Sequence, residues 1–264
     1  MFNVQVPIGS RWNCDIYNYT VDEYLGVEDA RYNYKMKCET AGTSPNNQTG
    51  DLTPITDYAN GLAYARITEC LIEGENELSD DEIREIYYSY VGSGSSDGNV
   101  GQYKTWCEMY DGVGNYKILP LWNGPNTVKV SILSTSNTIA SETLISEFQK
   151  YLDPGCTGMG DGVAPIGSVV TVSTATEKTI DISADIELEE GHSNTAVVSE
   201  SVENYLRSIS YEKSKAAYIN IGAAILNTEG VKSVSNLLLN GGTTDIELGD
   251  EEIPSLGNVQ WTVI

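Results

Sequence analysis

Residues 180–188 read Ile-Asp-Ile-Ser-Ala-Asp-Ile-Glu-Leu, the most regular alternation of apolar and polar side chains in the sequence. Successive side chains of a β-strand point to opposite faces of its sheet, so this period predicts a strand with one face in a core and the other in water. The expected core face consists of Ile180, Ile182, Ala184, Ile186 and Leu188. The C-terminal third of the chain should therefore be built on a half-buried sheet.

Helical periodicity follows this strand, with Val202 and Leu206 on one apolar face. We expect Ile182, Ala184 and Ile186 to pack against this helix, because the alternation leaves no other apolar face to cover them. The remaining expected elements are a helix over 217–225 and strands over 231–239, 243–248 and 259–264.

The part of the chain before residue 180 also alternates strands and helices. Ser79 followed by Glu82 forms a capping box, the pattern that starts a helix, and an apolar face of Ile83, Ile86, Tyr87 and Tyr90 follows. The other expected elements are a strand over 67–73, a helix over 100–107, a hairpin of 116–121 with 128–133, a helix over 141–152 ended by Asp153-Pro154-Gly155, and a strand over 168–173.

The order of these elements predicts an α+β fold. Residues 1–50 are rich in Tyr, Val, Asn and Thr and should form a β-rich segment that ends in a loop of Gly, Ser, Pro and Asn. Residues 51–175 and 176–264 should form two consecutive α+β sandwiches, each with helices on one face of a mainly antiparallel sheet. These three ranges are the predicted domains.

The charge of the chain limits its partners. Its 264 residues carry 15 Lys and Arg against 38 Asp and Glu, a formal net charge of −23. Binding to phosphate backbones or anionic membranes depends on clustered Lys and Arg, so neither nucleic acid nor a membrane is an expected partner. The first residues lack the basic flank and apolar run of a signal peptide, and we expect the chain to be cytoplasmic after synthesis.

The five cysteines are widely spaced and include no Cys-x-x-Cys pair. They are Cys14, Cys38, Cys70, Cys107 and Cys156. We expect buried, reduced thiols with no pairing among them, because a chain of this size needs no cross-link to hold its core.

No catalytic, cofactor-binding or metal-binding residue emerges from the motifs. The single histidine, His192, is expected in a solvated loop, because one His with scattered Cys makes no standard zinc site. The glycine cluster at 158–162 lacks the preceding strand and following helix of a phosphate-binding loop, so it should be a connector. Nucleophile-elbow, P-loop and His-Glu-x-x-His motifs are missing, and we expect a protein that is not an enzyme.

Two acidic groups keep one alternative open. They consist of Glu187, Glu189 and Glu190, and of Asp245, Glu247, Asp250, Glu251 and Glu252. Calcium prefers several carboxylate oxygens, but neither group has the EF-hand spacing, so both are expected to be solvated faces. An acidic calcium-dependent surface or secreted binding module is therefore the alternative function.

Tyrosine is unusually frequent, with 17 Tyr against 2 Phe. Tyr is enriched where one end of the ring is buried and the other contacts a partner, which favours an interaction protein over an enzyme with a pocket. General residue usage explains the same bias equally well.

Several stretches, in their order along the chain, resemble the baseplate J family of contractile phage tails. The stretches that carry the resemblance are Val6–Trp12, Cys38–Gly42, Gly50–Ile55, Leu78–Arg84, Tyr103–Trp106, Gly112–Gly114, Pro120–Val128 and Ala164–Gly167. The match covers residues 6 to 175 well and the remainder at the level of pattern. Proteins of this family usually carry a largely helical segment before the Val-Pro-x-Gly stretch, and we expect this chain to lack it.

The resemblance implies a structural role without catalytic residues or cofactors. It implies a baseplate wedge subunit of a contractile phage tail or phage-derived bacteriocin, forming part of the ring around the tail hub. Its implied partners are other wedge proteins, the tail hub and copies of itself. Its implied location is the virion tail baseplate, reached from the bacterial cytoplasm.

Overall fold

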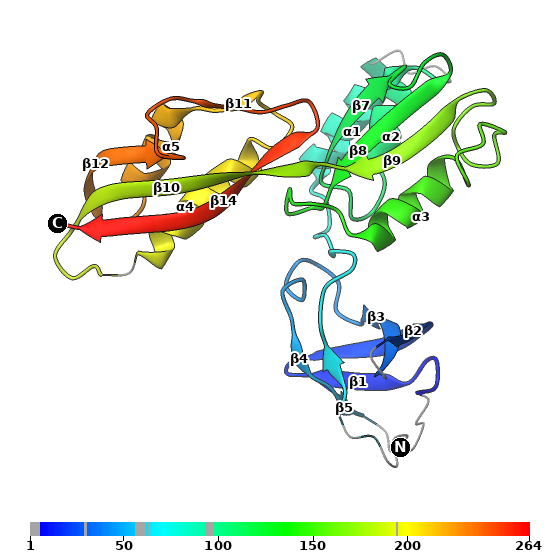
Figure 1. Ribbon diagram of the computed structural model, residues 1–264. Helices are drawn as coiled ribbons and strands as arrows, with labels where there is room; N and C mark the ends of the chain where they lie inside the picture. Colours follow the sequence, from blue (N-terminus) through cyan, green and yellow to red (C-terminus); the bar gives the residue numbers. More distant parts are fainter. Residues whose placement is uncertain (1–5, 29–30, 56–61, 63, 93–97, 194) are drawn as a thin grey trace. The chain divides into compact units, whose positions relative to one another are not determined.

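The computed structural model describes the chain except for residues 1–5, 29–30, 56–61, 63, 93–97 and 194 (Figure 1). The chain divides into two compact units, Met1–Arg84 and Glu85–Ile264. Seven of the nine strand pairings between described residues are antiparallel. The expected α+β fold with mainly antiparallel sheets is confirmed, and the three predicted domain ranges stay predictions.

The N-terminal unit contains an antiparallel sheet with the order β3-β2-β1-β5. The strands of the unit are β1 (Arg11–Cys14), β2 (Tyr17–Glu28), β3 (Arg31–Cys38), β4 (Gly50–Asp51), β5 (Thr53–Pro54) and β6 (Arg66–Ile67), with β4 paired to β6. Alternate side chains of β1 and β2 form a core of Trp12, Cys14, Tyr19 and Val21 together with Leu52. The expected β-rich start of the chain is confirmed.

The prediction of a strand over residues 67–73 is wrong, because β6 ends at Ile67. Gly74, directly after the expected strand, is held by a side chain instead of a strand ladder. The amide of Asn46 donates to Gly74 O over 2.9 Å and its Oδ1 accepts from Gly74 N over 2.8 Å. A side chain that satisfies backbone groups in this way competes with sheet formation.

The helix α1 (Asp80–Gly92) begins with the expected capping box. Ser79 Oγ donates to Glu82 Oε2 over 2.7 Å, and Glu82 N donates to Ser79 Oγ over 3.3 Å. The apolar face of this helix is not buried, since Ile83 is 51% and Tyr87 is 59% exposed. The side chain of Tyr90 lies outside the described residues.

The central part of the second unit is a sheet with the order β7-β8-β9. Its elements are α2 (Val100–Glu108), β7 (Asn115–Pro120), β8 (Thr127–Leu133), α3 (Glu142–Leu152) and β9 (Val169–Thr174). β7 and β8 form the expected hairpin, and β9 lies parallel to β8. A parallel neighbour needs a crossover connection, which α3 supplies. Leu144, Phe148 and Leu152 on α3 are fully buried.

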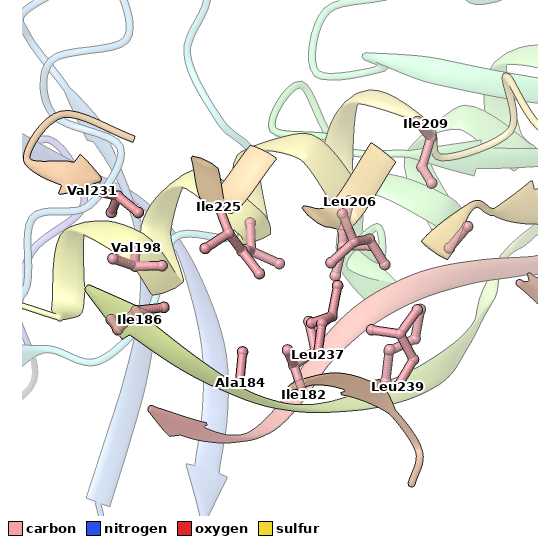
Figure 2. Packing of buried hydrophobic residues seen from close by; sticks show 14 residues of the cluster. Ile182, Ala184, Ile186, Val198, Leu206, Ile209, Ile225, Val231, Leu237 and Leu239 are labelled. Carbon is pink, nitrogen blue, oxygen red and sulfur yellow. The ribbon is translucent and has the colours of Figure 1, made fainter. Parts of the chain in front are cut away.

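The C-terminal part is a sheet with the order β12-β10-β14. Its elements are β10 (Thr176–Leu188), α4 (Ala196–Ser208), β11 (Lys215–Ala216), α5 (Tyr218–Leu226), β12 (Val231–Leu239), β13 (Ile246–Glu247) and β14 (Glu252–Val263). Ile182, Ala184 and Ile186 of β10 share one buried cluster with Val202 and Leu206 of α4. Figure 2 shows Ile182, Ala184, Ile186 and Leu206 between the sheet and the helices, and the shared cluster confirms the expected packing.

Two expectations for the end of the chain need correction. The strand expected over 243–248 shrinks to β13, which pairs with β11, because Asp245 binds both Lys215 Nζ and Tyr218 N. The last strand begins seven residues earlier than the expected 259, at Glu252, and runs parallel to β10. A strand's own alternation does not say which neighbour it pairs with or in which direction.

Candidate assembly site

The residues considered for chemistry lie apart from one another. His192 is exposed in the turn after β10, where its backbone N donates to Glu189 O over 3.0 Å. The glycine cluster connects α3 to β9, as expected. Gly162 approaches the carbonyl group of Leu152 so closely that a Cβ would collide with it.

Five of the eight acidic side chains in the two acidic groups, Glu187, Asp245, Asp250, Glu251 and Glu252, each pair with a single lysine. Glu187 binds Lys232 over 2.5 Å, and Glu252 binds Lys178 over 3.2 Å. The hydrogen bond from Lys232 lowers the pKa of Glu187, and hydrogen bonds from the backbone N–H of Gly249 and then from Lys178 lower the pKa of Glu252. In the described parts of the chain, no group of three or more His, Cys, Asp or Glu is placed to hold a metal ion.

The five cysteines are free thiols, but their burial differs. Cys14 and Cys107 are buried, and burial raises the pKa of the Cys107 thiol, which keeps it protonated and unreactive. The expectation of burial is wrong for Cys70 and Cys156, which are exposed. Cys70 is exposed because the strand expected around it does not form.

A buried carboxylate seals the outer edge of β9. Asp153, only 2% exposed, follows α3 and accepts from Val170 N over 3.0 Å and from Gly158 N over 3.1 Å. Gln149 on α3 takes the neighbouring groups, accepting from Val172 N over 2.7 Å and donating to Val170 O over 3.0 Å. The N–H and C=O of Val170 and the N–H of Val172, which point away from β8, are therefore already satisfied.

The second candidate feature is a joint between the central and C-terminal sheets, formed by the turn after α4. Tyr211 in this turn has φ 61°, a conformation that bulky residues adopt only when their surroundings impose it. Its hydroxyl lies 2.5 Å from Oγ of Ser131, a fully buried residue of β8. Asn115 of β7 donates to Ser210 O over 2.9 Å.

Apolar packing and ion pairs extend this joint. Leu133, Ala175 and Ile253 form a small buried cluster with Tyr211 packed against it. Two ion pairs add to it: Lys117 binds Asp250 over 2.8 Å, and Lys129 binds Glu251 while its Nζ lies 4.8 Å from the centre of the Trp122 ring. Ala175 alone separates β9 from β10, so the two sheets are linked almost directly along the chain (Figure 1).

The N-terminal unit presents a different surface, an aromatic hairpin of β2 and β3. The ring of Tyr24 lies 5.2 Å from that of Tyr34 and 6.1 Å from that of Tyr32. Tyr24 is 43% exposed, and its neighbours Leu25 and Val27 are more exposed still. Elsewhere tyrosines serve packing, as Tyr103 does at 2% exposure. The tyrosine bias therefore has both a structural and a surface component.

The sequence did not indicate Asp153 or Tyr211. Asp153 was interpreted only as part of a helix stop, although an Asp placed before Thr and Gly residues is a common acceptor for backbone N–H groups. Tyr211 had no local signal, because its partner Ser131 is 80 residues away in the sequence.

Within its described residues, the second unit has two sheets tied together by this joint and no group of side chains placed to hold a metal ion. Both parts of the unit match known family models. Residues 95–174 match the Baseplate J-like central domain, and residues 180–262 match the Baseplate J-like protein C-terminal domain. The chain belongs to the baseplate J-like family.

Its relatives include two proteins of Bacillus subtilis (strain 168). The chain is 37% identical to the phage-like element PBSX protein XkdT and 35% identical to the uncharacterized protein YqbT. Each alignment covers 97% of this chain and 72% of the relative. A chain in the cryo-EM structure of the anti-feeding prophage baseplate aligns with a TM-score of 0.47 at 9% identity, over 96% of this chain and 72% of that one.

Family membership identifies the chain as a phage baseplate component. The resemblance seen in the sequence is confirmed. Among the described residues, none of the helices is both long and apolar enough to cross a membrane.

Proposed function

We propose that this chain is a wedge subunit of the baseplate of a contractile phage tail or phage-derived bacteriocin, and that it forms part of the ring around the tail hub. The observation that carries the proposal is the direct succession of two baseplate J-like domains, with Ala175 alone between β9 and β10. A connection of one residue limits the movement of the two domains relative to each other, which suits a structural subunit of an assembly.

The joint supports a role in passing a conformational change outward to the sheath. Tyr211, Asn115 and the cluster around Ile253 tie the two domains at several points that are distant in sequence. A displacement of one sheet is then passed to the other through packed and hydrogen-bonded groups. In this proposal the protein collects in the bacterial cytoplasm before assembly, and its partners are other wedge proteins, the hub and copies of itself.

The proposal is tested by following the full chain into particles. An epitope-tagged chain would replace the native one in a bacterium that carries the corresponding phage-like element, and induced particles would be purified and imaged by cryo-electron microscopy. We expect the chain in a ring next to the tail hub. A chain found only outside the particles, or in the capsid or sheath alone, would contradict the proposal.

Two variants sharpen this experiment. Ile182→Asp should unfold the C-terminal core and abolish incorporation, whereas Asp181→Asn changes a neighbouring polar side chain and should preserve it. Equal incorporation of both variants would mean that the C-terminal domain is dispensable in the ring.

A further inference from the structure

The unguarded last part of β14 is the feature that the proposed assembly role leaves unexplained, whereas the first part of the strand carries Glu252 and Pro254 and has a register shift before Val259. β14 lies at the edge of the sheet β12-β10-β14, with β10 as its neighbour. Its last part and the residue after it, Val259 to Ile264, contain no charged side chain in a chain of net charge −23. Proteins usually protect a long edge strand with charges, proline or bulges, because its free backbone groups can pair with another chain.

The other described sheet edges are protected in one of these ways. Among the edge strands, β3 carries Arg31, β7 carries Lys117, and β5 is short and contains Pro54. β12 carries Lys232 and is distorted by Asn236, which has φ 50°. β9 also lacks charge, but Asp153 and Gln149 occupy its outer backbone groups.

The register shows which groups of β14 are open. Ile182 pairs with Val259 and Ile186 with Val263, with no shift between them. Ile264 N donates to Ile186 O over 3.0 Å, so the backbone of Ile264, and by alternation of Thr262 and Gln260, points toward β10. The backbone groups of Val259, Trp261 and Val263 point to the open edge. Within the described chain, no hydrogen bond reaches these outward groups.

The side chains at this edge are also partly uncovered. Val259 and Val263 pair with core positions of β10, so they lie on the helix-covered face, yet they are 37% and 55% exposed. Trp261, between them, is fixed by its indole N–H, which donates to Ser199 Oγ of α4 over 2.9 Å. A further strand beside β14 would cover these side chains and continue the core.

We propose that β14 is a docking edge that accepts an extended segment of another baseplate protein as an added strand. The charge of the surroundings defines this segment, since residues 176–264 carry 15 Asp and Glu against 5 Lys and Arg. Its residues on the helix side are apolar, and its polar residues are uncharged or basic. A second copy of this chain fits less well, because it would place two strongly acidic domains side by side. The inference rests on the proposed baseplate role.

The test blocks the open edge while leaving the pairing with β10 intact. Val263→Pro removes an N–H that points outward, and Val263→Lys places a charge at the edge, whereas Val263→Thr is the matched control that retains both the N–H and strand propensity. Circular dichroism and thermal unfolding would establish that each full-length variant folds. Incorporation into purified particles would then be measured by quantitative mass spectrometry.

We expect incorporation to fall by about tenfold or more for the Lys and Pro variants, the effect of losing one main-chain contact, and to remain unchanged for the Thr variant. In wild-type particles, the amides of Trp261 and Val263 should exchange hydrogen more slowly than in the free chain. Normal incorporation of folded Val263→Lys, or equal exchange in both states, would overturn the proposal.

Two further outcomes separate the sources of failure. If the wild-type chain itself stays outside the particles, the proposed baseplate role fails, whatever the variants do. If sedimentation shows that the free wild-type chain dimerises and that Val263→Lys abolishes the dimer, the occupant is a second copy and the proposed partner is wrong.

Discussion

The central and C-terminal sheets both have an edge strand that runs parallel to its neighbour and has no charge along its outer part, but only one of these edges is closed. On β9, Gln149 and Asp153 occupy the outward backbone groups of Val170 and Val172. On β14, the hydroxyl of Ser199 on the nearby helix α4 binds the side chain of Trp261, and no side chain in the described parts of the chain bonds to the outward backbone groups of Val259, Trp261 or Val263. Where a strand carries no charge of its own, as in β9, side chains from the neighbouring helix and its C-cap can protect the edge instead.

The largest expected effect is the unfolding of the C-terminal domain, which contains the open edge of β14. Ile182→Asp buries a carboxylate at a position that is 2% exposed, which costs several kcal/mol and should unfold the C-terminal domain while the β9 edge survives. Ile182→Val is the control and should cost about 1 kcal/mol. Calorimetry and hydrogen exchange would follow the two domains, and an unchanged melting temperature for the Asp variant would refute the core assignment.

The next variant opens the closed edge. Asp153→Ala leaves the amides of Val170 and Gly158 without their acceptor, so the free energy of unfolding should fall by about 3 kcal/mol. Asp153→Asn retains one acceptor oxygen and should cost less. Urea unfolding measures both losses, and sedimentation should reveal self-association of the Ala variant through β9. Equal stability of Ala variant and wild type would mean that the edge needs no seal.

A smaller effect concerns the joint between the two sheets. Tyr211→Phe removes the hydrogen bond to Ser131 and should cost about 1 kcal/mol. Tyr218→Phe is the matched control, because its hydroxyl donates to Leu237 O within the C-terminal domain. Hydrogen exchange should show the two sheets opening more independently in Tyr211→Phe alone. The same pattern in both variants would assign Tyr211 a purely local role.

The smallest effect is a pH dependence of the lysine pairs. Asp245 accepts hydrogen bonds from the Lys215 side chain and from Tyr218 N, and these bonds lower the pKa of Asp245 below its ordinary value of 3.8. A lowered folded-state pKa contributes stability above the unfolded-state value and loses it as the pH falls through the folded-state value. The melting temperature should therefore drop slightly below pH 3.8. Asp245→Asn should reduce this slope, and an identical slope would assign the acid sensitivity to other carboxylates.

The sequence predicted what depends on local periodicity. The alternation from Ile180 to Leu188 located β10 and its core face, and Ser79 with Glu82 located the start of α1. Sequence-based prediction failed where a residue or strand distant in the sequence determines the structure. The length and parallel direction of β14 depend on β10, and the seal on β9 depends on the carboxylate of Asp153 reaching backbone groups up to 17 residues away. Neither relation leaves a pattern within the strand itself.

The single residue between β9 and β10 has a mechanical consequence. A pulling force that enters the central sheet along β9 would pass into β10 without first straightening a loop. β10 is the middle strand of its sheet, so this force would load its hydrogen bonds to β12 and β14 together, in shear, rather than one after another as in peeling. The C-terminal domain should then resist stretching along β10 far more strongly than a pull that lifts β14 sideways from the edge.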